Sequence, residues 1–203
     1  MKKIIKIFII TCLLIINQLL ATTPKNIILL ISDGMGFNHV EATNYYQYGE
    51  NGKQVYEDFP VSCAMSTYNV NGEYNSKKAW HNFKYLIDKW TDSAAADTAM
   101  STGTKTHYGA IGVDKEANNL KHVIEFAEKN KKATGVITSV YLSHSTPAGF
   151  VAHNPDRHEY QEIAREMIMD SKVDVMMGCG HPLYNDNGEK IAGEEEKFDY
   201  QNQ

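Results

Sequence analysis

Three polar stretches of the sequence carry residue types that could bind a metal ion or take part in phosphoryl transfer. The first, "TDSAAADTAM", places Ser93 beside Asp92 and ahead of a run of small residues. The second, "ISDGMG", places Asp33 directly after an apolar segment. The third, "HSTPAGFVAHNPDR", begins at His144 and ends at Arg157. Together they offer a hydroxyl nucleophile, oxygen ligands for a cation and a cation for a phosphate.

Ser93 has two interpretations. At the start of a helix predicted over residues 92–100, backbone N–H groups and the helix dipole would favour a bound anion, and the small residues leave room for a phosphate-sized group. Alternatively, Ser93 or Asp92 is an N-cap of an alanine-rich helix, which the local sequence alone favours. A serine needs activation, and the sequence has no G-x-S-x-G elbow, so a metal ion would have to stabilise the alkoxide.

Asp33 and Arg157 also have two interpretations each. A carboxylate directly after an apolar strand must be paired or bind a cation, which favours a metal ligand at Asp33; the alternative is an ordinary Asp-Gly turn. Arg157 lies just before a predicted helix and could grip a phosphate with two parallel hydrogen bonds. Its alternative is a solvated surface arginine.

The elements that must position these residues alternate between strands and helices. Short apolar runs predict buried strands at residues 25–32, 133–140 and 173–178. Helical patterns cover residues 92–100, 118–132 and 158–170, with Asn118 or Asn119 as the cap of the second. Residues 44–88, rich in Tyr, Asn and Gly, predict loops with short strands. The alternation indicates a parallel, doubly wound α/β sheet, in which the polar stretches that follow strands can converge.

Composition and the N-terminal segment narrow the setting. The 203 residues are 42% hydrophobic and carry a net charge of −5, which allows a sizeable core and gives no reason to expect a nucleic-acid partner. Residues 1–21 are typical of a signal peptide, which predicts a secreted or periplasmic protein; a retained anchor is the alternative and would be the contact with a membrane. Cys63 and Cys179 then remain, either as a disulfide or as two buried thiols.

The three polar stretches, taken in order, resemble the motifs of the metal-dependent alkaline phosphatases. The matching segments are "ISDGMG", "TDSAAADTAMSTGTKTHYGAIGVD" and "HSTPAGFVAHNPDR", and the resemblance runs from about residue 26 to about residue 180. It implies a three-layer α/β/α sandwich with a mostly parallel central sheet. Residues 22–203 would then be the N-terminal part of an alkaline-phosphatase-like domain.

The resemblance also implies a role for each motif residue. Ser93 matches the nucleophile that becomes phosphorylated, and Arg157 matches the arginine that binds the phosphate oxygens. Asp33 matches a carboxylate shared between zinc and magnesium, and Thr146 matches a magnesium ligand. Asp92 matches the acid that orients the arginine. The implied reaction is hydrolysis of small phosphate monoesters through a phosphoserine, with zinc on the Ser93 oxygen.

Two positions depart from the motifs of some relatives. His144 stands where some bacterial members carry an aspartate and where animal and some marine bacterial members carry histidine. It is therefore expected to hold a metal-bound water near the magnesium, rather than the metal itself. Asp97 stands where a small residue is common, and it is either solvated or in contact with the loop that carries Arg157.

The remaining zinc ligands of the family have no match in the segment after residue 180. The expectation is that this chain is the N-terminal part of a longer enzyme, which would form a homodimer at full length. The alternative is a catalytically incomplete remnant that binds phosphate, because a zinc ion held by Asp33 and Ser93 alone would be under-coordinated.

Overall fold

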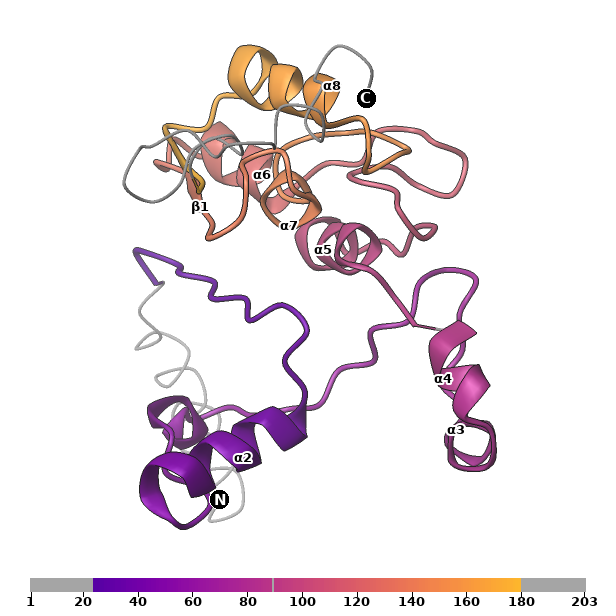
Figure 1. Cartoon of the computed structure of the whole chain (residues 1–203). Coiled ribbons are helices and arrows are strands. Elements are labelled where there is room, and N and C mark those ends of the chain that lie inside the picture. Colours follow the sequence, from indigo (N-terminus) through magenta and orange to yellow (C-terminus); the bar gives the residue numbers. More distant parts are fainter. Residues whose placement is uncertain (1–23, 89, 180–203) are drawn as a thin grey trace, which may run out of the picture. The chain divides into compact units, whose positions relative to one another are not determined.

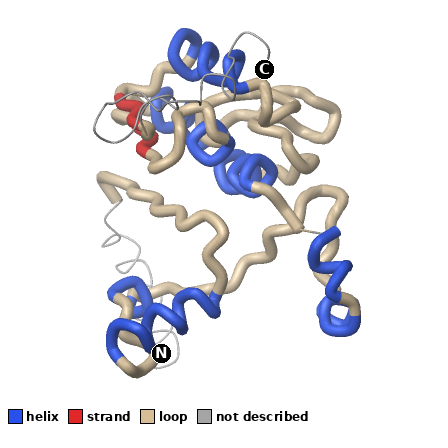
Figure 2. Tube along the Cα trace, in the orientation of Figure 1, coloured by secondary structure: helices blue, strands red, loops and turns tan. Residues whose placement is uncertain are grey.

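A computed structural model of the chain describes residues 24–88 and 90–179, and the predicted signal peptide and the acidic tail lie outside these residues. The chain divides into two compact units, residues 1–40 and residues 41–203, which are described separately. No helix among the described residues is long and apolar enough to cross a membrane. Figure 2 shows short helices and strands joined by longer loops.

The first unit contains the run predicted as a buried strand, and that prediction is wrong. Residues 25–32 form no strand, and Ile27, Ile28 and Leu30 are each more than four-fifths exposed. A strand exists only through pairing with a neighbour, and within the described ranges the paired strands lie elsewhere. The run ends in a turn, in which Met35 N–H donates to the carbonyl of Ser32 at 3.2 Å.

Residues 41–88 are largely helical, so the short strands predicted here are also wrong. Asn44 is completely buried, and its amide nitrogen donates to Asn51 Oδ1 at 3.0 Å and to Glu57 Oε2 at 2.7 Å. Its side-chain oxygen accepts from Lys53 N–H at 2.9 Å. Such side-chain bonds satisfy the backbone without a strand partner. The elements are α2 (Phe37–Tyr48), the 3₁₀ turn η1 (Val55–Asp58), α3 (Ser76–His81) and α4 (Phe83–Asp88).

The helix predicted over residues 92–100 is confirmed as α5 (Ser93–Thr102). Asp92 is its N-cap, and Gly103 ends it in the left-handed conformation, with φ of 74°. Two buried hydroxyls fix its position: Thr98 Oγ1 donates to the Ala110 carbonyl at 3.2 Å, and Ser101 Oγ donates to the Gly149 carbonyl at 2.5 Å. Contacts along the whole of α5 therefore fix the position of its first turn.

The helix predicted over residues 118–132 is shorter and begins later, as α6 (Val123–Lys129). Its N-cap is His122, whose backbone N–H is accepted by Glu125 Oε2 at 2.8 Å. Asn118 is not the cap, because its backbone N–H donates to Asp114 Oδ1 at 2.9 Å in the preceding turn. The two residues favoured as caps therefore belong to the loop, not to the helix.

The strands predicted at residues 133–140 and 173–178 are confirmed as β1 (Gly135–Ile137) and β2 (Val175–Met177). They pair in parallel, with Gly135 opposite Val175. The connection runs through α7 (Ser145–Ala148), α8 (Tyr160–Arg165) and the π-helical turn η2 (Glu166–Asp170), as Figure 1 shows. Both strands alternate exposed and half-buried residues, so the expected burial on both faces is not found in this two-stranded sheet.

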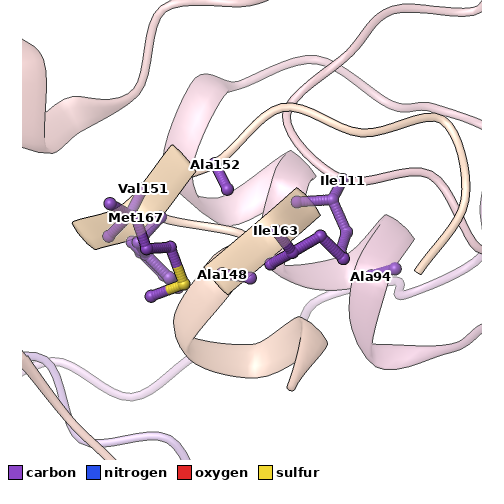
Figure 3. Packing of buried hydrophobic residues seen from close by; sticks show 8 residues of the cluster. Ala94, Ile111, Ala148, Val151, Ala152, Ile163 and Met167 are labelled. Atoms are coloured by element: carbon purple, nitrogen blue, oxygen red, sulfur yellow. The ribbon is translucent and has the colours of Figure 1, made fainter. Parts of the chain in front are cut away.

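One apolar core joins α5, α7 and the α8–η2 segment (Figure 3). At the edge of this core, the backbone of Gly112 lies close to that of Ala152. Only glycine fits there, because the φ of Gly112 is 61° and a Cβ would lie 2.2 Å from the Ala152 carbonyl oxygen. Cys63 and Cys179 are both exposed and are not joined in a disulfide, so neither the disulfide nor the buried thiols are found. The buried residues of the core cluster are Ala94, Ile111, Ala148, Phe150, Val151, Ala152, Ile163 and Met167.

Candidate active site

Asp92 carries a buried charge whose hydrogen bonds are well satisfied. Its side chain is only 4% exposed. As the N-cap of α5 it accepts from Ala95 N–H at 3.2 Å through Oδ1. Its Oδ2 accepts from Gly109 N–H at 3.1 Å and from Arg157 Nη1 at 3.0 Å. Three donors, one of them positively charged, offset the cost of removing this carboxylate from water.

Arg157 reaches Asp92 because its loop is fastened to the turn that follows α5. Its backbone N–H donates to the Gly109 carbonyl at 2.8 Å. Two residues after Gly109 and three before Arg157, Ile111 and Asn154 exchange backbone hydrogen bonds, each of 2.8 Å, as an antiparallel bridge. The guanidinium is 18% exposed, and Nη2 lies 3.5 Å from His144 Nε2. The arginine is therefore positioned by backbone as well as by charge.

His144 is the N-cap of the short helix α7, and two contacts fix the orientation of its ring. Its Nδ1 accepts from Thr146 N–H at 3.3 Å, and Tyr141 packs edge-on against the ring. Arg157 Nη2 lies 3.5 Å from His144 Nε2, and a guanidinium can only donate. A neutral imidazole accepts at one nitrogen only, so the contacts to the Thr146 amide and to Arg157 call for different tautomers. In either tautomer the ring lies between that amide and the guanidinium.

Ser93 is the first residue of α5, directly after the Asp92 cap, and it is half-buried. Asp97, one turn further along α5, is only 2% exposed, so the solvated alternative for this residue is wrong. It packs against the end of α7, where a Cβ on Gly149 would lie 2.6 Å from Asp97 Cβ. Close packing of α5 on α7 thus depends on a glycine at that position.

The second unit therefore joins most of the residues chosen from the sequence through a series of contacts. Asp92 contacts Arg157, which faces His144, and the Thr146 amide donates to His144. Asp33 lies in the first unit, exposed, at the turn that ends the apolar run.

Gly109 is the site residue that the sequence analysis missed. Its N–H binds Asp92 and its carbonyl binds the Arg157 backbone, so one peptide segment holds both partners. It adopts φ of 81°, which favours glycine. The only signal in the sequence is a glycine in "HYGAIG", which is common in turns and does not by itself indicate a site.

Comparison with known proteins identifies the family of the chain. A family model described as alkaline phosphatase matches residues 24–201. The chain is 32% identical over 185 residues to alkaline phosphatase 4 of Bacillus subtilis (strain 168), covering 87% of this chain and 37% of the relative. It is similar to the crystal structure of a cold-active alkaline phosphatase from a psychrophilic Shewanella species, with a TM-score of 0.62, 32% identity and coverage of 77% and 36%.

A third match is a variant of the TAB5 alkaline phosphatase, solved with Mg bound in its M3 site, in which one histidine is replaced by aspartate. It has a TM-score of 0.52, 30% identity and coverage of 76% of this chain and 39% of that chain. The chain thus spans little more than a third of the length of these relatives. The α/β fold predicted from the sequence is confirmed by these structures and by the parallel pairing of β1 with β2. The chain belongs to the alkaline phosphatase family.

Proposed function

We propose that the protein hydrolyses phosphate monoesters through a phosphoserine intermediate at Ser93. The observation that carries the proposal is the Asp92–Arg157 pair, whose atoms are 3.0 Å apart. Because Asp92 is also the N-cap of α5, this pair holds a guanidinium close to the helix terminus at which Ser93 lies. A nucleophile, a helix N-terminus and an arginine are the parts that phosphoryl transfer requires for attack and for charge stabilisation.

Arg157 would bind the non-bridging oxygens of the phosphate. A guanidinium has five N–H groups in a planar fork, and Asp92 takes one of those on Nη1. The Nη2 side faces His144. A phosphate oxygen in that region would accept from the remaining N–H groups of the fork, and the role of Asp92 would be to keep the fork in place.

Ser93 would supply the nucleophilic oxygen. Its Oγ would form a bond to phosphorus as the bond from phosphorus to the ester oxygen breaks, and the serine proton would end, by way of solvent, on the departing alcohol. A water molecule then cleaves the phosphoserine, which releases inorganic phosphate and restores the hydroxyl. Backbone N–H groups at the start of α5 would stabilise negative charge during both steps.

The donor set of the chain suits magnesium. Asp33, Ser93 and Thr146 offer a carboxylate and two hydroxyls, which are hard oxygen ligands of the kind that magnesium prefers. We propose that Asp33 and Thr146 hold the ion, with a metal-bound water beside His144. Magnesium bound in the M3 site of the TAB5 variant supports a magnesium cofactor, and the sequence motifs supply the choice of ligands. When bound, the cation would lower the pKa of a coordinated hydroxyl and neutralise charge.

The residues proposed for the phosphatase site do not by themselves fit zinc. Of the residues proposed for it, only Asp33 and Ser93 belong to this chain, whereas a zinc site takes about four ligands. Whether turnover depends on zinc is one of the outcomes of the assay below.

The test is hydrolysis of an aryl phosphate by the purified protein, with magnesium, zinc, both or neither. Ser93→Ala should remove most turnover and all covalent phosphate label, while Ser139→Ala, at an exposed serine, should remove neither. Near-normal turnover by Ser93→Ala would sink the nucleophile assignment. Phosphate binding without turnover in the parent protein would favour the incomplete, phosphate-binding alternative.

Three further proposals concern the whole protein. We propose small phosphate monoesters as substrates, a secreted or periplasmic location, and a homodimer at full length. The signal-like residues 1–21 support the location, and the names of the bacterial relatives support the substrate class. Cell fractionation and light scattering test the location and the dimer.

A further inference from the structure

A second cluster of titratable side chains lies away from the proposed phosphatase residues, where α6 meets η2. His122, Glu125 and His153 place one possible ligand atom each within 4.8 Å of one another. Glu166 adjoins them, with Oε1 at 2.7 Å from His153 Nδ1 and Oε2 accepting from the His153 backbone N–H at 2.9 Å. None of these residues is used in the proposed phosphoryl transfer.

His122 is the member of this cluster that packing alone does not explain. Its side chain is completely buried, yet both of its ring nitrogens lack a hydrogen-bond partner among the described residues. Buried polar atoms are nearly always satisfied, by protein, by water or by an ion. Burial, and then the nearby charge of His153, lower the pKa of His122 to about 4. The ring is therefore neutral at physiological pH, the state in which imidazole binds a metal.

The distance between His122 and Glu125 is compatible with a metal ion between them. Nδ1 of His122 lies 3.9 Å from Glu125 Oε2, too far for a hydrogen bond. In the tautomer with its proton on Nε2, the lone pair of Nδ1 faces the carboxylate, and a cation between the two atoms would be attracted to both. Zinc bonds of about 2.0–2.1 Å in a tetrahedral site place ligand atoms about 3.3 Å apart. Small side-chain movements would close the observed spacing to that value.

His153 is already oriented as metal-binding histidines are. One ring nitrogen, Nε2, lies 2.7 Å from the Leu120 carbonyl, and a contact of this kind fixes the ring of a ligating imidazole. Its ring lies 4.5 Å from that of His122, centroid to centroid. Ligation requires one of its nitrogens to give up a proton, as it does for every imidazole ligand. Glu166 would then be released from His153 Nδ1 and be available as a fourth ligand.

Three of the four members of the cluster border a cavity, and the buried His122 lies behind them. Glu125, His153 and Glu166 line one side of a cavity of about 370 Å³, which Phe150 and Val173 also border. Imidazole and carboxylate donors together are the ligand set of zinc rather than of magnesium or calcium. We propose that His122, Glu125 and His153, with Glu166 as the adjacent carboxylate, form an accessory zinc site that ties α6 to η2. This proposal is independent of the proposed phosphatase activity.

The experiment measures zinc by equilibrium dialysis and metal analysis. The full chain would carry Asp33→Asn and Thr146→Val, which remove the ligands proposed for the phosphatase site. This background should bind one zinc per chain and, with cobalt in place of zinc, should show visible d–d bands typical of four-coordinate sites.

Two variants then test the ligands. His122→Leu should weaken zinc binding at least about 100-fold, which exceeds the effect of losing an outer-shell partner. Glu125→Gln keeps an acceptor for the His122 backbone N–H but loses the carboxylate, so it decides the matter if His122→Leu does not fold. His158→Asn, at an exposed histidine, is the control and should leave zinc affinity unchanged.

The proposal is overturned if Glu125→Gln, or a folded His122→Leu, keeps its zinc affinity within about threefold. It is overturned equally if the folded background binds no zinc. In that case the cluster is two tilted imidazole rings held beside Glu166, and the zinc readout separates the two possibilities without any measurement of phosphatase activity.

Discussion

The second unit buries two groups of ionisable side chains, and they differ in how their polar atoms are satisfied. The Asp92–Arg157 pair is complemented on all sides, since the carboxylate accepts from a cap amide, a turn amide and the guanidinium. The cluster around His122 has a hydrogen-bonded pair, His153 and Glu166, beside a ring whose nitrogens have no hydrogen-bond partner among the described residues. A complemented group resists change and fixes a geometry, whereas an uncomplemented one is suited to accept a ligand.

Removing Asp92 should have the largest effect on stability. Asp92→Ala leaves Arg157, only 18% exposed, without its partner and removes the cap of α5. We expect a loss of about 3 kcal/mol in the free energy of unfolding, the lower end for a broken buried pair because Arg157 retains some solvent. Urea unfolding measures it.

Asp92→Asn is the matched control, because asparagine still caps the helix but carries no charge. It should lose less than Asp92→Ala. A loss below about 1 kcal/mol for Asp92→Ala would show that the pair is not what fixes this region.

Removing Arg157 should act mainly on phosphate. Arg157→Ala should weaken inhibition by inorganic phosphate by about 1.5–3 kcal/mol, or roughly 10- to 150-fold, the scale of charged hydrogen bonds. Arg157→Lys should recover only part of the loss, since a point charge lacks the planar fork. The measurement is the inhibition constant of inorganic phosphate for the parent protein and the two variants. An unchanged constant for Arg157→Ala would show that Arg157 does not bind phosphate.

The pH dependence of stability should report on His122. Its folded pKa of about 4 is below the ordinary value of 6.5, so the unfolded chain binds more protons between these values. The free energy of unfolding should therefore rise with pH, by about 2 kcal/mol between pH 4.5 and 6.5.

His153 and Glu166 change the free energy of unfolding mainly outside the range from pH 4.5 to 6.5. The pKa of His153 is raised, because hydrogen bonds to Glu166 and Leu120 outweigh the lowering effect of burial, so its contribution is lost only above pH 6.5. The pKa of Glu166 is lowered, because bonds from His153 outweigh its burial, so its contribution is lost mainly below pH 4.5. Chelator-treated protein, unfolded in urea at several pH values, tests the slope, and His122→Leu should flatten it.

Replacing His122 in the metal-free protein should have the smallest effect on stability. His122→Leu removes two nitrogens that have no hydrogen-bond partner among the described residues, so the free energy of unfolding at pH 7 should change by less than about 1 kcal/mol. His153→Leu, which breaks the bonds to Glu166 and Leu120, should cost more. A loss above about 2 kcal/mol for His122→Leu would mean that the ring is complemented after all.

The sequence predicted well those features that local chemistry determines. Asp92, one of the two expected caps, begins α5, and the apolar runs at β1 and β2 pair in parallel. The same rule failed at residues 25–32, because an apolar run specifies a strand only when a neighbour is there to pair with it. It also failed at residues 44–88, where buried Asn44 organises the chain through side-chain bonds that no periodicity reveals.

The candidate site divides in a similar way. Motif residues such as Asp92 and Arg157 were identified from the sequence and are in contact, 65 positions apart. The contribution of Gly109 is made by its backbone, so its residue type carries no sign of it beyond turn formation. The His122 cluster went unnoticed because its members come from separate segments and have none of the spacings of a compact zinc motif.

The turn at Gly109 has a consequence for engineering the chain. Its N–H and its carbonyl serve the two partners of one ion pair, so the spacing along the backbone between Gly109 and Ile111 fixes where Arg157 stands relative to α5. One extra residue between them would shift the Ile111–Asn154 bridge out of register with the Gly109–Arg157 bond. Insertions should therefore be far less tolerated here than in the exposed segment around Val61, and a library of one-residue insertions at both places would show the contrast.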